Sequence, residues 1–249
     1  MSGWDAFLAS YHAAHPAITE DLLLPMRGPG GLQPYAWLAE GLPTTGPVWD
    51  VCCGSAPMAD VVGVDRYEGV DASAAELAEA VARRPGTRVR HGEAMTADPA
   101  DPPVAVTVAM ALMLLPLQAF LARAASLLPV GGRLQAMVPT RENAGSTGYG
   151  TLLRLLGQSG SGYRQALAPE VVAAALEVAG FALLDDEVAL FHRAVAPRDV
   201  DLVAASFYVR HPGGDDDAAR QWLTARSREP GFLLDYPLRR LRAVRVPDA

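Results

Sequence analysis

Along the middle of the chain, short apolar runs alternate with segments in which apolar residues recur every three or four positions. The short runs predict strands, and the periodic segments predict helices with one buried face. The run from 104 to 109 has one polar side chain, that of Thr107, as expected of a parallel strand buried on both faces. The predicted strands of this part are Val48–Val51, Tyr67–Val70, Thr87–Arg90, Val104–Ala109 and Leu134–Val138.

Strands and helices alternate throughout residues 46–140, and this predicts an α/β fold with a doubly wound, mostly parallel sheet. Two further strands are expected at Phe181–Leu184 and Leu238–Val246, which makes the predicted sheet seven-stranded. We expect the last one to be an antiparallel edge strand whose solvated charges prevent pairing with other chains, and an anion site is the alternative. The charges belong to Arg239, Arg240, Arg242 and Arg245.

Local signals define the helices between these strands. Ser73 is suited to be the N-cap of a helix over 73–84, because its hydroxyl can accept a hydrogen bond from a backbone N–H of the first turn. Glu76 would complete a capping box by bonding back to the Ser73 backbone. Further helices are predicted at 57–62, from Pro116 onward, and at 149–156, 169–179, 199–208 and 216–226.

The first 45 residues have a different character from the rest. Trp4, Phe7, Leu8 and Tyr11 recur at helical spacing and predict a short amphipathic segment within residues 1–25. We therefore divide the chain into an N-terminal helical cap, residues 1–45, and a main domain, residues 46–249. The alternative is that these aromatic residues only pack the N-terminal segment onto the main domain.

The stretch Val48–Met58, VWDVCCGSAPM, contains the first signal of function. A strand is followed by small residues and then by Pro57, which suits the first turn of a helix. A turn without bulky side chains lets backbone N–H groups approach a ligand at the positive end of a helix dipole. Asp71 follows Asp50 by about 20 residues, the spacing at which an acid after the second strand accepts hydrogen bonds from ribose hydroxyls. Together these features predict a site for a nucleotide-like cofactor.

The segment DVCCGSAP resembles motif I of the class I S-adenosylmethionine (SAM)-dependent methyltransferases, acid-x-Gly-x-Gly-x-Gly. GVDAS at 69–73 resembles their motif II, HGEA at 91–94 their third motif, and LPVGG at 128–132 the turn before their fifth strand. The sequence departs from motif I at Cys52 and Ala56, where glycines are usual, but both residues are small. The region from Met110 to Leu117 and the small-residue composition resemble the small-molecule, quinone-biosynthesis type of this family.

The resemblance implies a Rossmann-like methyltransferase fold that transfers a methyl group from SAM and releases S-adenosylhomocysteine. It places Asp71 on the ribose hydroxyls and Glu93 near the adenine amino group. No metal ion is implied. The residues it assigns to cofactor binding are Asp50, Cys52, Cys53, Gly54, Asp71, Ala72, Glu93, Ala94 and Met110.

The acceptor side of the site is less defined by the sequence. Transfer to oxygen or nitrogen usually needs a base, and histidine is the side chain most often suited to that task near neutral pH. We predict His12 or His15 on the cap as this base, rather than His91, His192 or His211. The predicted substrate-binding residues are Tyr11, Met113 and Tyr149.

Composition, charge and cysteine content limit the classes of partner and the compartment that suit this chain. The chain has 249 residues, half of them hydrophobic, a net charge of −7, and no basic cluster before residue 238, which argues against nucleic acid as a substrate. The longest apolar run, Val104–Leu117, is too short to span a bilayer. Two adjacent cysteines cannot form a disulfide framework, and they suit a reducing cytoplasm. We expect a cytoplasmic protein with a small-molecule substrate, either monomeric or homodimeric.

Three alternatives stay open at this point. An NAD(P)-dependent oxidoreductase shares the fold and the acid after the second strand, but Pro57 lacks the N–H that a pyrophosphate would need there. A SAM-binding enzyme with other chemistry, such as a cyclase, would carry the same residues. So would a non-catalytic SAM-binding protein.

Overall fold

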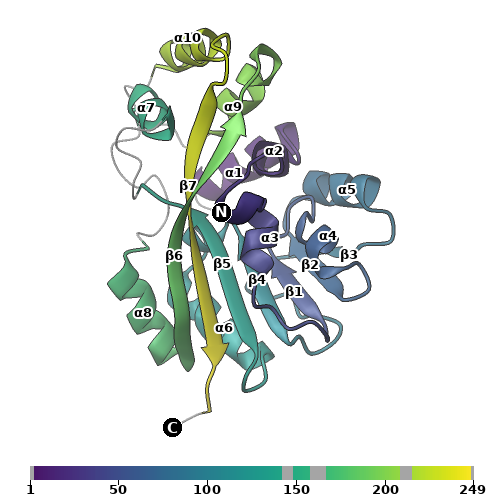
Figure 1. Ribbon diagram of the computed structural model, residues 1–249. Coiled ribbons are helices and arrows are strands. Elements are labelled where there is room, and N and C mark those ends of the chain that lie inside the picture. Colours follow the sequence, from purple (N-terminus) through teal and green to yellow (C-terminus); the bar gives the residue numbers. More distant parts are fainter. Residues whose placement is uncertain (1–2, 142–147, 158–166, 208–214, 248–249) are drawn as a thin grey trace.

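The computed structural model describes residues 3–141, 148–157, 167–207 and 215–247 (Figure 1). Its strands form one seven-stranded sheet in the order β3-β2-β1-β4-β5-β7-β6. β1 to β5 are parallel, whereas β7 runs antiparallel to both of its neighbours. The predicted fold class is therefore confirmed. The strands are β1 Val48–Val51, β2 Tyr67–Asp71, β3 Arg88–His91, β4 Ala105–Ala109, β5 Arg133–Pro139, β6 Phe181–Ala194 and β7 Leu233–Arg245.

Helices cover both faces of the sheet and enclose two apolar cores. On one face α6 and α8 pack against alternate residues of β1, β4 and β5, among them Trp49 and Val106. On the other face α2 to α5 pack around Tyr67 and Met137. None of the helices in the described part of the chain has the length and apolarity needed to span a membrane. The α-helices are α1 Gly3–Ala14, α2 Ile18–Leu23, α3 Pro34–Ala39, α4 Met58–Val62, α5 Ala74–Arg83, α6 Leu117–Leu127, α7 Gly148–Leu155, α8 Pro169–Val178, α9 Val200–Ser206 and α10 Asp216–Arg226. Short 3-10 helices are η1 Pro29–Gly31, η2 Leu112–Leu114 and η3 Pro197–Asp199.

The last two strands are much longer than the sequence predicts. β6 and β7 rise beyond the rest of the sheet, and α7, α9 and α10 lie around their upper ends (Figure 1). The predicted sixth strand ends at Leu184, directly before three acids, residues 185–187. In the structure these acids continue the strand, since each of them pairs with an arginine of β7.

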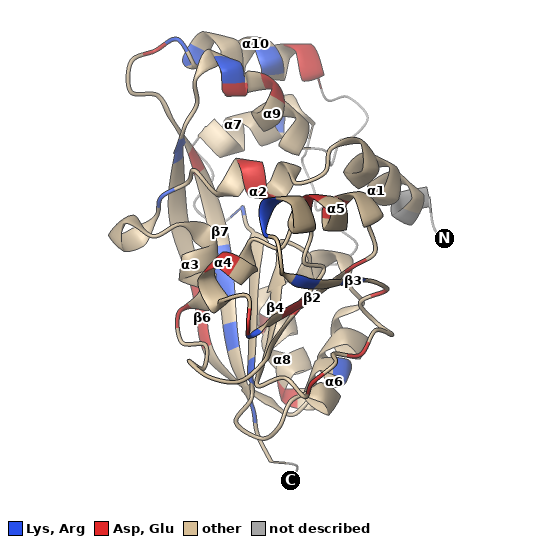
Figure 2. Ribbon diagram, turned by 90° about the vertical axis from the view of Figure 1, so that its right-hand side faces the viewer, with Lys and Arg blue, Asp and Glu red and all other residues tan. Residues whose placement is uncertain are grey.

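The expectation of a solvated edge strand at the C-terminus is wrong. β7 lies inside the sheet, and the side chains of Arg239 and Arg240 are 6% and 4% exposed. The Arg240 guanidinium lies 2.6 Å from Glu187 and 2.8 Å from Glu40, and 4.4 Å from the ring centre of Trp37. Basic and acidic residues lie along β6 and β7 (Figure 2). A buried charge needs such partners, which the one-dimensional pattern does not reveal.

Buried polar contacts join the N-terminal helices to the sheet domain. Glu20 of α2, 3% exposed, accepts hydrogen bonds from Arg84 at 2.7 Å and from the Ser55 hydroxyl at 2.6 Å. The Tyr11 hydroxyl of α1 donates to the carbonyl of Ala205 at 2.5 Å. The N-terminal segment therefore contacts both the turn after β1 and the upper helices. The division of the chain at residue 45 stays a prediction.

Candidate functional site

Every second residue of the turn between β1 and α4 has a left-handed backbone conformation. Cys52, Gly54 and Ala56 have φ angles of +56°, +54° and +62°, all in the left-handed region. These are the three positions to which the resembled motif assigns glycine. A residue with a Cβ costs about 1–2 kcal/mol in this conformation. The turn thus keeps the glycine-type backbone although two of the three glycines are replaced.

Asp71 holds this turn against the end of β2. The N–H of Gly54 donates to one carboxylate oxygen of Asp71 at 2.8 Å, and the N–H of Ser73 donates to the other at 2.8 Å. Burial raises the pKa of Asp71, and these two backbone hydrogen bonds oppose the shift. The structure therefore brings the predicted turn and the predicted acid into direct contact.

Asp50, also predicted to bind the cofactor, supports the turn from within the sheet. It is 1% exposed, and its carboxylate accepts hydrogen bonds from the Thr107 hydroxyl at 2.6 Å and the Tyr67 hydroxyl at 2.9 Å. Burial raises its pKa from 3.8 to about 7, while the two hydroxyl bonds favour the ionised form. The contacts observed for Asp50 are thus structural, and a direct contact with a cofactor stays a prediction.

Both cysteines are free thiols at the base of the turn. Burial is the main cause that raises the pKa of Cys52 and of Cys53, and the nearby carboxylates of Asp50 and Asp71 add to it. Because the thiolate is the reactive form of cysteine, these thiols are poor nucleophiles. Cys53 is 5% exposed and belongs to the core around α3 and α4.

The remaining predicted cofactor residues lie at the carboxyl ends of β2, β3 and β4. The carbonyl of Ala72 is 2.9 Å from Nε2 of His91. Glu93 is exposed in the turn after β3, and its charge contributes to the raised pKa of Cys52. Ala94 packs against the edge of the core beside α6. Met110 follows β4 with a φ of +62° and donates its N–H to the carbonyl of Met137 at 2.6 Å.

Glu76 is a site residue for which the sequence predicted a different role. Its carboxylate is 2.8 Å from Nδ1 of His12 and 2.9 Å from the N–H of Ala17, and the residue is 4% exposed. Only half of the predicted capping box therefore forms, through the Ser73 hydroxyl. A Cβ added to Gly54 would lie 3.5 Å from Glu76 Oε2, so this carboxylate borders the turn. Long-range partners of this kind leave no local signal in the sequence.

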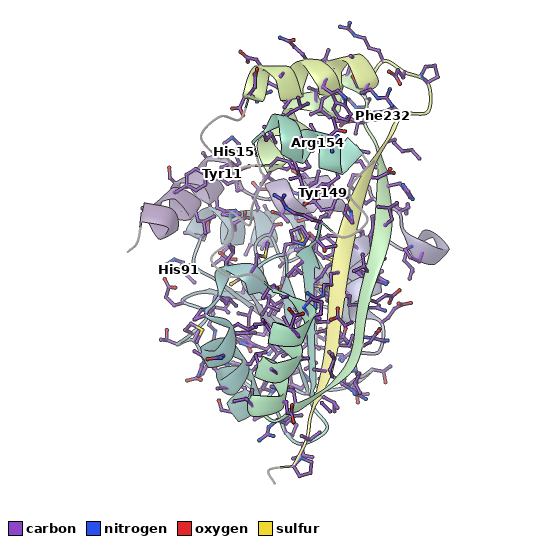
Figure 3. All side chains as sticks on the ribbon, turned by 90° about the vertical axis from the view of Figure 1, so that its left-hand side faces the viewer. Tyr11, His15, His91, Tyr149, Arg154 and Phe232 are labelled. Atoms are coloured by element: carbon purple, nitrogen blue, oxygen red, sulfur yellow. The ribbon has the colours of Figure 1, made fainter. Side chains whose placement is uncertain are left out.

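The two histidines of α1 have different surroundings. His12 pairs with Glu76 and lies close enough to Asp71 to oppose, as a smaller effect, the rise in the pKa of that carboxyl that burial causes. His15 is exposed, and its ring stacks on Tyr11 with centroids 4.8 Å apart. Figure 3 shows Tyr11 and His15 together, well away from His91. The structure thus brings His12, but not His15, to the turn. His211 lies outside the described residues.

Two predicted substrate residues are packed into cores. Met113 is 4% exposed and belongs to the core between the sheet and the helices α6 and α8. Its observed contacts are those of a core residue, and a role in substrate binding stays a prediction. Tyr149, also 4% exposed, has its ring centre 4.6 Å from that of Tyr236 and 5.6 Å from that of Phe207. Its observed contacts attach α7 to β7 and α9, and a role in substrate binding stays a prediction.

No metal-binding group of three or more His, Cys, Asp or Glu side chains occurs among the described residues. No family model and no curated protein matches the chain. Solved structures do match. One is a Bacillus halodurans protein whose assignment as a methyltransferase is provisional, with 17% identity, a TM-score of 0.57, and coverage of 86% of this chain and 99% of that one.

Two further structures are informative. The geranyl diphosphate C-methyltransferase of Streptomyces coelicolor, solved with Mg²⁺, geranyl diphosphate and S-adenosylhomocysteine, is 16% identical, with a TM-score of 0.51, over 85% of this chain and 78% of that one. The [4+2]-cyclase SpnF is 20% identical, with a TM-score of 0.54, over 86% of this chain and 81% of that one. At these identities the likeness shows a shared fold.

The left-handed conformation of Ala56 leads to a prediction about the free energy of unfolding. Replacing Ala56 by Gly removes a buried methyl group but also relieves about 1–2 kcal/mol of backbone strain. We expect the free energy of unfolding, measured in urea, to change by less than about 0.5 kcal/mol. Ala59→Gly, at a buried position of helix α4, is the matched control and should cost about 1 kcal/mol or more. Equal losses for the two variants would contradict strain at Ala56.

The buried Asp50 carboxyl makes a prediction about pH. Because its pKa is raised from 3.8 to about 7 in the folded protein, its contribution to stability is fully present below pH 3.8 and is lost as the pH rises toward 7. Asp50→Asn removes this titration. The stability of the variant relative to wild type should therefore rise from pH 4 to pH 7, by on the order of 1 kcal/mol per pH unit.

Urea unfolding of both proteins at several pH values measures this difference, and Asp65→Asn, at an exposed position before β2, serves as control. A constant difference between Asp50→Asn and wild type across this range would show that Asp50 does not titrate as described.

Proposed function

We propose that this protein is a SAM-dependent methyltransferase that acts on a small-molecule acceptor. The observation that carries the proposal is the left-handed turn of Cys52, Gly54 and Ala56, joined through the Gly54 N–H to Asp71. It lies at the carboxyl ends of neighbouring parallel strands, where α/β folds bind their ligands. A structure with the same fold was solved with S-adenosylhomocysteine, which supports the same cofactor class here.

The residues around the turn fit SAM chemically. SAM carries positive charge on its sulfonium and ammonium groups, and the carboxylates of Asp71, Glu76 and Glu93 lie near the turn. Asp71 would hold the ribose hydroxyls, and the backbone at Gly54 would lie against the methionine part. When bound, SAM supplies an electrophilic methyl carbon. The remaining task of this chain is to orient an acceptor and exclude water.

The same site fits a pyrophosphate cofactor poorly. Pro57 occupies the N-cap of α4 and has no N–H to donate. Helix α4 spans only Met58–Val62, so few aligned peptide dipoles point at the turn. The carboxylates nearby would also repel phosphate groups. These features favour SAM over NAD(P).

The chain shares its fold with a [4+2]-cyclase, so SAM binding without methyl transfer is the alternative that experiments must exclude. In that alternative, the turn and Asp71 would bind SAM in the same way, but no S-adenosylhomocysteine would form. We favour methyl transfer, as in the geranyl diphosphate C-methyltransferase of similar fold. We also propose a cytoplasmic location, because the described thiols are free and a reducing compartment keeps them so.

For the acceptor side we propose His12 of α1 as the base, if the acceptor is a hydroxyl or an amine. Its Nδ1 faces Glu76 at 2.8 Å, and such a carboxylate partner orients the ring. Nε2 would then accept the proton. Helix α1 also lies over the turn through this contact and so helps to exclude water from it.

Cofactor binding provides the first test. Asp71→Ala removes a charge-assisted hydrogen bond worth about 1.5–3 kcal/mol, so the affinity for SAM should fall roughly ten- to a hundredfold in calorimetry. Asp65→Ala, at an exposed position before the start of the same strand, should bind SAM like wild type. Unchanged affinity of Asp71→Ala would refute the ribose assignment.

Turnover provides the second test. S-adenosylhomocysteine release is measured with a panel of hydroxyl, amine and activated-carbon acceptors. With a hydroxyl or amine acceptor, we expect His12→Ala to lower kcat roughly a hundredfold, as loss of a general base does, and His15→Ala to keep it. Wild-type kcat for His12→Ala at all pH values would exclude it as the base. Product formation without S-adenosylhomocysteine would favour cyclase-type chemistry.

A further inference from the structure

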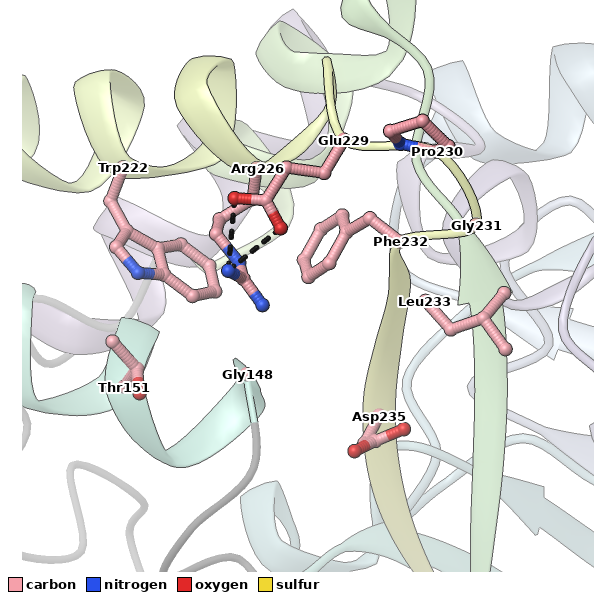
Figure 4. Close-up of a pocket in the computed structure, with 10 residues that line it drawn as sticks. All are labelled: Gly148, Thr151, Trp222, Arg226, Glu229, Pro230, Gly231, Phe232, Leu233 and Asp235. Atoms are coloured by element: carbon pink, nitrogen blue, oxygen red, sulfur yellow. Dashed lines mark hydrogen bonds and ion pairs between the residues drawn. The ribbon is translucent and has the colours of Figure 1, made fainter.

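A cavity of about 490 Å³ opens between α7, α10 and the start of β7 (Figure 4). Thr151 of α7, Trp222 of α10 and Asp235 of β7 are among the residues that line it. None of its described lining residues belongs to the turn of residues 52–56 or to the end of β2. The cavity is therefore separate from the candidate SAM site, and ligand binding in it would be independent of the proposed function.

One wall of the cavity is aromatic. The rings of Trp222 and Phe232 meet edge to face, with centroids 5.9 Å apart. The Arg226 guanidinium lies 5.1 Å from the centre of the Phe232 ring, an arrangement that orients the cation by cation–π attraction. Rings held in this way offer a surface on which a flat apolar group can pack.

The same wall carries the positive charge of Arg226, and the ion pair of this guanidinium with Glu229 leaves N–H donors for a ligand. Glu229 contacts Arg226 at Nη1, 2.8 Å away, and a guanidinium has five N–H donors. The two side chains are 44% and 49% exposed, and ion pairs at such exposure contribute little to stability. A ligand carboxylate can thus share this guanidinium at small cost.

The facing wall carries a negative charge. Asp235 lies across the cavity from Arg226 (Figure 4). One of its oxygens is 2.7 Å from Nδ1 of His192, its cross-strand partner on β6. This contact fixes the carboxylate at the cavity edge, where it can accept hydrogen bonds from an ammonium group.

We propose that this cavity binds small zwitterions of the aromatic amino-acid class. The ligand carboxylate binds Arg226, its ammonium group binds Asp235, and its ring packs on Trp222 and Phe232. A ligand with only a negative charge would be repelled by Asp235, and a ligand with only a positive charge would be repelled by Arg226. A neutral apolar ligand would desolvate both charges without pairing either, which is unfavourable.

Calorimetry with three probes tests this arrangement. L-phenylalanine carries both charges, 3-phenylpropionate lacks the ammonium group, and phenethylamine lacks the carboxylate. We expect saturable binding of phenylalanine and at least roughly tenfold weaker binding of each analogue, since each loses a charge-assisted hydrogen bond. No saturable binding of phenylalanine, or equal affinities for the three probes, would overturn the proposal.

Substitutions of the lining residues test whether phenylalanine binds in this cavity. Arg226→Met and Asp235→Asn should each weaken phenylalanine binding roughly tenfold. Arg220→Met is the matched control, because Arg220 lies on the same helix but pairs with Asp201 outside the cavity, and it should leave the affinity unchanged. Circular dichroism checks that the variants are folded.

A competition experiment tests whether the site is separate. Phenylalanine affinity should be the same with and without saturating S-adenosylhomocysteine. Displacement by S-adenosylhomocysteine, or wild-type affinity in Arg226→Met, would contradict a second site at this place.

Discussion

The hydrogen bond from the Gly54 N–H to the Asp71 carboxylate, 2.8 Å long, is the contact on which the candidate site depends. It joins the ends of β1 and β2, and Gly54 forms it from a left-handed backbone conformation. The parallel sheet contributes to this contact, since it brings the carboxyl ends of both strands to one edge. Beneath the turn, Asp50 accepts hydrogen bonds from Tyr67 and Thr107 and so ties β1 to β2 and β4.

The N-terminal helices complete the surroundings of this turn. Glu20 of α2 bonds the Ser55 hydroxyl, and the buried Arg84 compensates its charge. Glu76 of α5 connects His12 of α1 to the neighbourhood of Gly54. The site is therefore rich in carboxylates, which suits a cofactor of net positive charge. Helices α1 and α2 thus contact the surroundings of the turn, and their role as a cap over an acceptor stays a prediction.

Local patterns predicted the first five strands and the small-residue turn, because alternation and small residues are properties of neighbouring residues. The role of Asp71 as a ribose ligand stays a prediction. The misses share a different cause. Arg240 is buried because Glu187 and Glu40 compensate its charge, and these partners come from distant segments. Glu76 follows the pattern of a capping box, yet its carboxylate bonds α1.

The central claim is that the left-handed turn and Asp71 form a SAM site. The most direct measurement is a crystal structure of the protein with S-adenosylhomocysteine. The account predicts the ribose hydroxyls within hydrogen-bond distance of the Asp71 carboxylate, and the homocysteine part against the backbone at Gly54. A ligand bound elsewhere, or one whose ribose does not contact Asp71 while the turn keeps its conformation, would contradict it.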